Sequence, residues 1–364
     1  MANYYYSTQN YIGKDWKENL GIADINFIRP DALYAFASHT FTTGGGTSNS
    51  PAAQSSFVSA YTSAGASWAS NSNYFTSGEY NGFQKWTVPE NATYRFVVRG
   101  SSGGLNKYYQ ALNNSNFNQY YGAEITADIV LAQGTLIQLI VGHKGEDAGT
   151  HFNIVGNSSE GDNAAAGGGG ASYVFYNTSD ANPIFAAGAG GGGSKTFSSL
   201  GHASLSNNGN NSAAGGLGYG LGGQNGNGGR ANNGGSSYWS AGGAGWLTNG
   251  TGGNQSVNYN EAAGNSSNGA TGGKAPRNNG YGGPRGTDGT DSGGNGGFGG
   301  GGGGFSDNAG CGGGAGYSGG AGCNNSVSNG CGGGGGTYST GSATSVSTVL
   351  RNTHGDGTIS ISKL

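Results

Sequence analysis

The sequence predicts a mainly β fold: a β-sandwich with a large inserted bundle of glycine-rich helices, preceded by a small N-terminal docking segment. Three observations support this prediction. Glycine accounts for 82 of the 364 residues, and 61 of these glycines lie in residues 167–336, against a usual content of about 7%. Segments with the pattern of strands lie on both sides of that block. Only 9% of the residues are charged and 11% are aromatic, which is unlike a disordered, solvated chain.

The N-terminal region, residues 1–80, has the fewest glycines and the only stretches that suit a helix. Asp31 has the chemistry of an N-cap and precedes the apolar residues 32–37, which predicts one or two helical turns there. Residues 42–56 are rich in Thr, Gly, Ser and Pro and are expected to form a loop. We therefore divide the chain into a docking segment, residues 1–80, and a glycine-rich domain, residues 81–364.

Strand-like segments begin near residue 81. Residues 123–131 carry the apolar residues Ile125, Ala127, Ile129 and Leu131 at strict period two. Residues 136–141 are almost continuously apolar, as in a buried strand. Residues 173–176 are expected to pair with residues 184–187 across the turn between them. These strands fall within residues 81–190 and 337–364 and so bracket the glycine block. The expected strands are residues 83–88, 94–99, 123–131, 136–141, 173–176, 184–187 and 357–364.

The glycine block, residues 167–336, is open to two interpretations. A flexible linker would have this composition, but a linker has no reason to lie between two halves of one sheet. Glycine lets backbones approach closely, so extended left-handed helices with three residues per turn can pack side by side and hydrogen-bond laterally. We therefore expect a bundle of the polyglycine-II type. Collagen is excluded because a Gly-X-Y repeat is absent and the chain has only six prolines.

The order of motifs over residues 80–364 resembles a known domain type. It is similar to the glycine-rich domain found outside the kinase in the anaplastic-lymphoma and leukocyte receptor tyrosine kinases. It also resembles glycine-rich proteins of bacteria and phages, including marine phage tail fibres and other virion structural proteins. The motifs are residues 86–100 (WTVPENATYRFVVRG), 103–104 (GG), 122–125 (GAEI), 134–142 (GTLIQLIVG), 167–170 (GGGG), 172–174 (SYV), 183–188 (PIFAAG), 190–193 (GGGG), 331–336 (CGGGGG), 338 (Y) and 354–361 (HGDGTISI).

The resemblance implies a β-sandwich from which a bundle of glycine-rich helices projects. It also implies that the protein binds a partner and does not catalyse a reaction. A receptor fits poorly, because the sequence shows no kinase, no secretory signal and no apolar run of 18 residues. The favoured function is a non-enzymatic, tail-fibre-like protein of the virion surface that mediates attachment to the host cell surface. The alternatives are a purely structural shell-decoration or filament subunit and an extracellular ligand-binding module.

The resemblance also implies partners. Residues 1–80 would bind other virion proteins, and the glycine-rich domain would contact a host cell-surface glycan or protein. Fibres of this class favour a homo-oligomer, with a trimer expected. The formal net charge of −3 and the lack of a basic stripe argue against nucleic acid as a partner, and no membrane insertion is expected.

Aromatic residues are the most suggestive candidates for contacts, with 21 tyrosines and five tryptophans in a chain of few charges. Such rings either fill the sandwich and cap the bundle, or lie exposed in loops. Exposed rings would contact a host glycan or protein, because they give a large contact area at low entropic cost. The two interpretations stay open. The candidate receptor-contact residues are Tyr219, Tyr238, Trp239, Trp246, Tyr259 and Tyr281.

Motifs for catalysis or metal binding are weak, and no catalytic, cofactor or metal site is predicted. Residues 316–320 match Gly-x-Ser-x-Gly around Ser318, but chance matches are expected in a block of this composition. Two groups offer metal-binding side chains without a recognised spacing: His143, Glu146, Asp147 and His151, and the pair Asp288 and Asp291.

The three cysteines all lie near the end of the glycine block. At most one intramolecular disulfide can form between two of Cys311, Cys323 and Cys331, which leaves one thiol over. The sequence does not select which two would pair.

Overall fold

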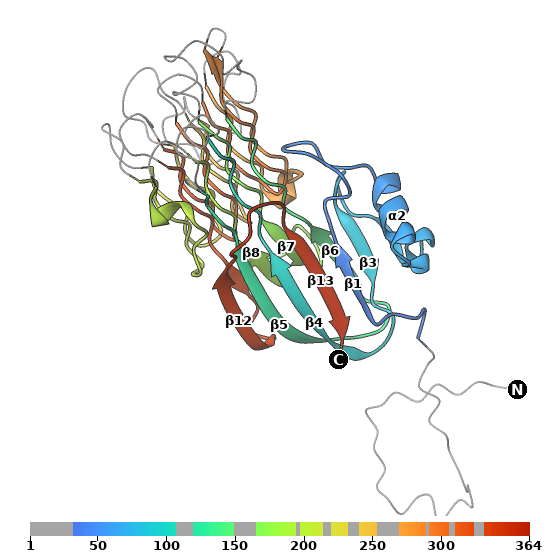
Figure 1. The fold of residues 1–364 in the computed structure, drawn as a ribbon. Coiled ribbons are helices and arrows are strands. Elements are labelled where there is room, and N and C mark those ends of the chain that lie inside the picture. Colours follow the sequence, from blue (N-terminus) through green and yellow to red (C-terminus); the bar gives the residue numbers. More distant parts are fainter. Residues whose placement is uncertain are drawn as a thin grey trace, which may run out of the picture. The chain divides into compact units, whose positions relative to one another are not determined.

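The computed structural model describes residues 32–106, 119–148, 165–193, 197–213, 220–231, 240–252, 269–288, 291–305, 310–323 and 331–364. The chain separates into two compact units, Met1–Ala32 and Leu33–Leu364. The second unit is mainly β, with two antiparallel sheets (Figure 1), so the predicted fold class is confirmed at that level. The candidate residues Tyr219, Tyr238, Trp239, Tyr259 and His151 lie outside the described residues.

The first sheet has five antiparallel strands, and the second has six. In spatial order the first contains β1 (Ser38–Phe41), β13 (Thr358–Lys363), β4 (Ala92–Arg99), β5 (Ala123–Leu131) and β12 (Thr344–Leu350). The second contains β11 (Tyr338–Ser339), β8 (Phe185–Ala187), β7 (Ser172–Phe175), β6 (Leu136–Ile140), β3 (Gln84–Thr87) and β2 (Phe75–Ser77). A separate short hairpin joins β9 (Thr287–Asp288) to β10 (Asp291–Ser292).

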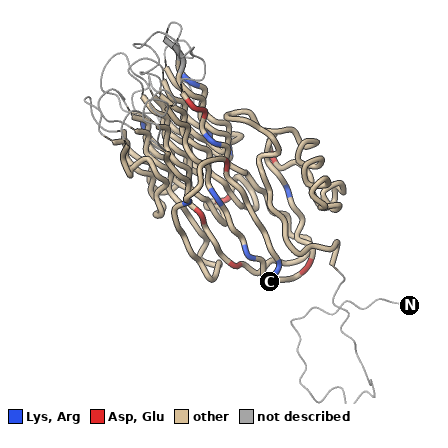
Figure 2. The backbone as a smooth tube through the Cα atoms, in the orientation of Figure 1, with Lys and Arg blue, Asp and Glu red and all other residues tan. Residues whose placement is uncertain are grey.

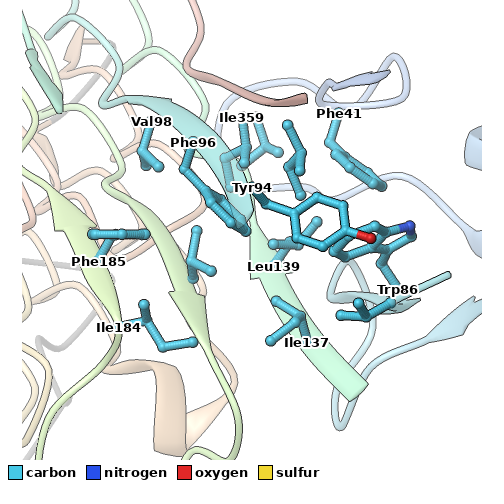
Figure 3. Close-up of a cluster of buried hydrophobic side chains, with 14 of the residues drawn as sticks. Phe41, Trp86, Tyr94, Phe96, Val98, Ile137, Leu139, Ile184, Phe185 and Ile359 are labelled. Atoms are coloured by element: carbon cyan, nitrogen blue, oxygen red, sulfur yellow. The ribbon is translucent and has the colours of Figure 1, made fainter. Parts of the chain in front are cut away.

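The main hydrophobic core lies between the two sheets (Figure 3). Alternate side chains of β4, including Tyr94 and Phe96, point into it and are buried, as expected for a strand with one face on a core. They meet Trp86, Ile137 and Phe185 from the second sheet. The burial of these apolar surfaces stabilises the pairing of the sheets at roughly 25 cal/mol per Å².

The second sheet is covered on both faces. Tyr173 and Phe175 of β7 point away from the main core and belong to a second cluster with Trp246 and Phe298 from the glycine block. All four residues of β7 are therefore buried. The near-continuous apolar sequence of β6 and β7 follows from this double coverage.

The seven predicted strands are all present, with ends shifted by one or two residues. The predicted pairing across residues 177–183 is confirmed, because β7 and β8 are antiparallel neighbours. The last strand returns as β13 to pair with β4, with Ile361 opposite Phe96. The strands that the sequence did not indicate are β1, β2, β9, β10, β11 and β12.

Two local predictions in the N-terminal region are wrong. Residues 32–37 are not helical, because Phe36 is buried against Trp86 at 5.2 Å between ring centroids and leads the chain into β1. The helix instead is α2 (Gln54–Ser63), which begins inside the expected loop and buries Phe57 and Tyr61 on one face. Tertiary packing overrides local propensity in both places. No helix of the described residues is long and apolar enough to span a membrane.

The predicted domain boundary at residue 80 is also corrected. The compact unit begins at Leu33. Within residues 33–80, β1 pairs with β13 in the first sheet and β2 pairs with β3 in the second. These pairings complete one edge of each sheet, so residues 33–80 belong to the two-sheet body and do not form a separate segment.

The described glycine-rich segments are extended and buried, and they run side by side at one end of the two sheets (Figure 1). Their only helices among the described residues are the short 3₁₀ turns η2 (Ser199–Gly201) and η3 (Pro276–Asn278). Figure 2 shows long uncharged stretches in these segments. Their amides must therefore find partners other than charged side chains or the bonds of an α-helix.

The amides are satisfied by lateral bonds to many neighbours, as residues 312–314 illustrate. The N–H groups of these three consecutive glycines donate to three different segments, at Ala166, Ala241 and Gly333, over 2.9–3.0 Å. Their carbonyls accept from three others, at Gly192, Gly302 and Gly320, over 2.7–2.9 Å. Residues 241–243 follow the same pattern, donating to Gly303, Thr251 and Gly320 and accepting from Gly313, Gly273 and Gly229. We call this network the glycine lattice.

Close backbone approach explains why these positions are glycine. A Cβ atom at Gly313 would lie less than 3.0 Å from the carbonyl oxygen of Gly320 and from the amide nitrogen of Gly243. The same holds at Gly168, where the obstacle is the Gly313 carbonyl. Because the obstacles are backbone atoms, they cannot rotate away, and any side chain must push two segments apart.

We predict that Gly313→Ala destabilises the protein by about 1–3 kcal/mol, the usual cost of overpacking a tight interior. The matched control is Gly341→Ala, because a Cβ there meets no atom within 4 Å. Thermal unfolding followed by circular dichroism should show a lower Tm for Gly313→Ala and an unchanged Tm for the control. Equal melting temperatures for the two variants would contradict the close packing of the lattice.

Candidate functional site

Trp246 requires a correction, because the structure does not expose it as a receptor contact. Its exposed fraction is 0%. Its ring packs against Tyr173 and Phe175, with centroid distances of 5.8 and 5.3 Å, and its Nε1–H donates to the carbonyl of Asp180 at 2.9 Å. Trp246 therefore packs the glycine lattice against the second sheet. Because its side chain is buried, it cannot contact an external partner.

Tyr281 is the other candidate contact residue within the described ranges. It is half-buried, and its ring meets Phe298 edge-on at 5.8 Å. Its carbonyl accepts from the backbone N–H of Lys274 at 2.8 Å, which ties it to a neighbouring part of the lattice. Part of its side chain is accessible, so its role as a contact stays a prediction.

The three cysteines are buried thiols, and no disulfide joins them in the structure. Cys311 and Cys323 share a small cluster with Ala165, and the Cys311 N–H donates to the Cys323 sulfur at 2.9 Å. Cys331 lies in another cluster, with Tyr120 and Ala213. Burial raises the pKa of the Cys331 thiol to about 11.

The weak catalytic motif has a structural explanation. Ser318 is fully buried, and its hydroxyl accepts the N–H of Gly226 at 3.1 Å. Its carbonyl accepts from Gly336 at 2.7 Å. Ser318 therefore belongs to the glycine lattice, where a substrate cannot reach its hydroxyl.

The side chains considered for metal binding are engaged separately where they are described. The His143 ring is buried with Nδ1 3.1 Å from the Ser48 carbonyl, and burial lowers its pKa. Glu146 accepts from the side chain of Asn295, and Asp147 pairs with Lys144 at 2.6 Å. Within the described ranges, no three His, Cys, Asp or Glu side chains gather closely enough to hold a metal ion.

A cluster of rings that the sequence did not single out lies beside the lattice. Phe197 is 56% exposed, and its ring stacks on buried Tyr120 at 5.8 Å. His202 packs against Phe197 at 5.6 Å and stacks nearly parallel on Tyr121, with centroids 5.4 Å apart and planes 8° apart. We call Tyr120, Tyr121, Phe197 and His202 the aromatic platform.

Backbone contacts hold the aromatic platform in place. The Tyr121 N–H donates to Nδ1 of His202 at 3.1 Å, and the Ala203 N–H donates to the Tyr121 carbonyl at 2.9 Å. The side-chain amide of Asn210 donates to the carbonyls of Leu200 and His202. These bonds fix the rings before any ligand arrives, which lowers the entropic cost of binding.

The sequence offered little that would identify this platform. Phe197 and His202 lie far along the chain from the tyrosine pair at 120–121, and no spacing rule connects them. Only the pairing of the intervening strands brings them together. The one available signal is an isolated phenylalanine followed by a histidine in a segment otherwise made of small and polar residues.

The buried thiols should resist modification. We predict that an aromatic disulfide reagent at pH 8 reacts with none of the three cysteines in the native chain and with all three after denaturation. The reason is burial, together with the small thiolate fraction of Cys331, about a thousandth at this pH. Absorbance of the released thiolate measures the reaction, and a Ser206→Cys variant, at an exposed position, is the positive control. Rapid reaction of the native wild type would contradict the burial of these residues.

A comparison of the chain with models of protein families finds no match.

Proposed function

We propose that residues 167–336 form a bundle of polyglycine-II-like helices extruded from a β-sandwich. The supporting observation is the bonding of residues 312–314 and 241–243, in which three consecutive residues donate to three segments and accept from three others. A helix with three residues per turn directs successive N–H groups about 120° apart, toward three neighbours. A β-strand, by contrast, bonds to only two neighbours, within one plane.

We further propose that the chain is a non-enzymatic, tail-fibre-like protein of the virion surface that mediates attachment to the host cell. The six-neighbour lattice is the observation that carries this proposal, because it supports the resemblance to glycine-rich virion proteins. Such a lattice offers almost no side chains for chemistry, but it holds what is attached to it in a fixed position. That combination suits a protein that presents contacts at the surface of a particle.

The candidate contacts are joined to the lattice at neighbouring points. Ala241 follows the stretch that contains Tyr238 and Trp239, and Ala270 follows the stretch that contains Tyr259. Both alanines are buried in one cluster with Phe305. The described residues that follow these two stretches are therefore neighbours, which supports a shared contact with a host glycan or protein.

Docking to other virion proteins is proposed for the residues that precede Leu33. Residues 33–80 supply β1, β2 and α2 to the two-sheet body, so they form part of that body. A homo-oligomer, with a trimer favoured, follows from the resemblance to fibres.

The alternative function is a structural shell-decoration or filament subunit. The same lattice supports this alternative, because in such a subunit the rigidity of the lattice would be the function.

Binding of the purified, fluorescently labelled full-length chain to host cells tests the attachment function. We predict saturable binding at micromolar concentration, and we predict that the chain competes with particles for adsorption. The control is the same chain after thermal unfolding, which loses the lattice and should lose competition. Absence of binding by the folded chain, together with hundreds of copies per particle, would contradict attachment and favour the structural alternative.

A further inference from the structure

The aromatic platform has the features of a binding site for a small polar ligand with an apolar face. Phe197 leaves more than half of its surface in water although Tyr120 and His202 pack against it. An exposed aromatic ring gives a ligand a large contact area at low entropic cost. The ring is also held in place from below by the stacked Tyr120, so it offers a flat, fixed surface.

We propose that Phe197, His202 and Tyr121 bind a neutral sugar of a glycan, with one face of the sugar ring stacked on Phe197. The C–H groups on one face of a pyranose form an apolar patch of about the size of a phenyl ring. The electron-rich face of an aromatic ring attracts such weakly positive hydrogens. The hydroxyl groups at the sugar's edge then require hydrogen-bond partners beside the ring.

His202 supplies such a partner. Its Nδ1 accepts the backbone N–H of Tyr121, so in the neutral ring the proton is on Nε2, which is a donor. No described residue accepts a hydrogen bond from this Nε2–H. The imidazole packs against Phe197 with ring centroids 5.6 Å apart, and the proposal pairs this donor with a hydroxyl oxygen of the sugar stacked on the phenyl ring.

The charge state of the platform favours a neutral ligand. Burial lowers the pKa of the His202 imidazole below its ordinary value, so the ring is neutral at pH 7. Burial also raises the pKa of the Tyr120 hydroxyl, and Phe197 and Asn210, which holds the backbone beside the platform, have no ionisable group. These groups offer no cation to pair with an anionic sugar. A neutral sugar needs no charged partner and can bind through stacking and hydrogen bonds.

This inference rests on the proposed function, because it names a neutral glycan as a ligand of the attachment protein. It concerns a different part of the molecule from the candidate contacts Tyr238, Trp239 and Tyr259. The platform is formed by residues 120–121 and by Phe197 and His202, so the inference adds a second, separate set of contact residues.

The test is saturation-transfer NMR of the full-length chain with the methyl glycosides of glucose, galactose, mannose and N-acetylglucosamine. We expect at least one to bind the wild type, and we expect Phe197→Ala to weaken that binding by about tenfold, as loss of a stacking ring does elsewhere. Phe197→Tyr keeps the ring and should keep binding. Val130→Ala, on the exposed side of β5 with 76% of its surface accessible, is the control for loss of an exposed apolar side chain.

A second readout separates binding from folding. The NMR signals of the His202 ring protons should shift on addition of the sugar in the wild type and in Val130→Ala, and not in Phe197→Ala.

The proposal is overturned if the wild type binds none of the four glycosides, or if Phe197→Ala binds as well as the wild type. Adsorption of the wild type to host cells in either case would leave the attachment function standing. Sugar binding through Phe197 without adsorption to cells would instead support the platform and contradict attachment.

Discussion

The lateral hydrogen bond between glycine backbones is the interaction on which the rest of this structure depends. Each amide buried without a partner would cost about 1–3 kcal/mol, and the described segments of the glycine block bury many of them with few large apolar side chains to compensate. Distributing the donors of residues such as 312–314 over three neighbours resolves this problem. The solution requires that neighbouring backbones touch, which excludes Cβ atoms and so determines the composition of nearly half of the chain.

The two-sheet body and the lattice stabilise each other through a small number of large side chains. Trp246 packs from the lattice onto Tyr173 and Phe175, and Phe298 belongs to the same cluster, so the central strand β7 is buried on both faces. The first sheet keeps one polar face, where Arg95 pairs with Asp128 at 2.8 Å and Arg99 pairs with Glu124 at 2.6 Å. Among the described residues, the aromatic platform offers a partly exposed group of rings beside the lattice.

The sequence predicted the parts of the fold that have a local signal. Alternation identified β4 and β5, and the glycine composition identified a block between strands. It missed β1 and α2, because Phe36, Phe57 and Tyr61 reveal their positions only through packing with Trp86 and other distant residues. Trp246 was a candidate contact, with burial left open, because a tryptophan among glycines carries no signal that separates the two. The platform was missed for the related reason that His202 and Tyr121 meet only in the folded chain.

Amide hydrogen–deuterium exchange, read by mass spectrometry on the full-length chain, tests the central claim most directly. If lateral bonds hold the glycine segments, the amides of residues 165–170, 240–245, 299–304 and 310–316 should exchange as slowly as those of β4 and β5, since opening any one segment breaks bonds to several neighbours. Exchange of these amides at the rate of an unfolded peptide, while β4 and β5 stay protected, would show that the block is a linker and would contradict the lattice.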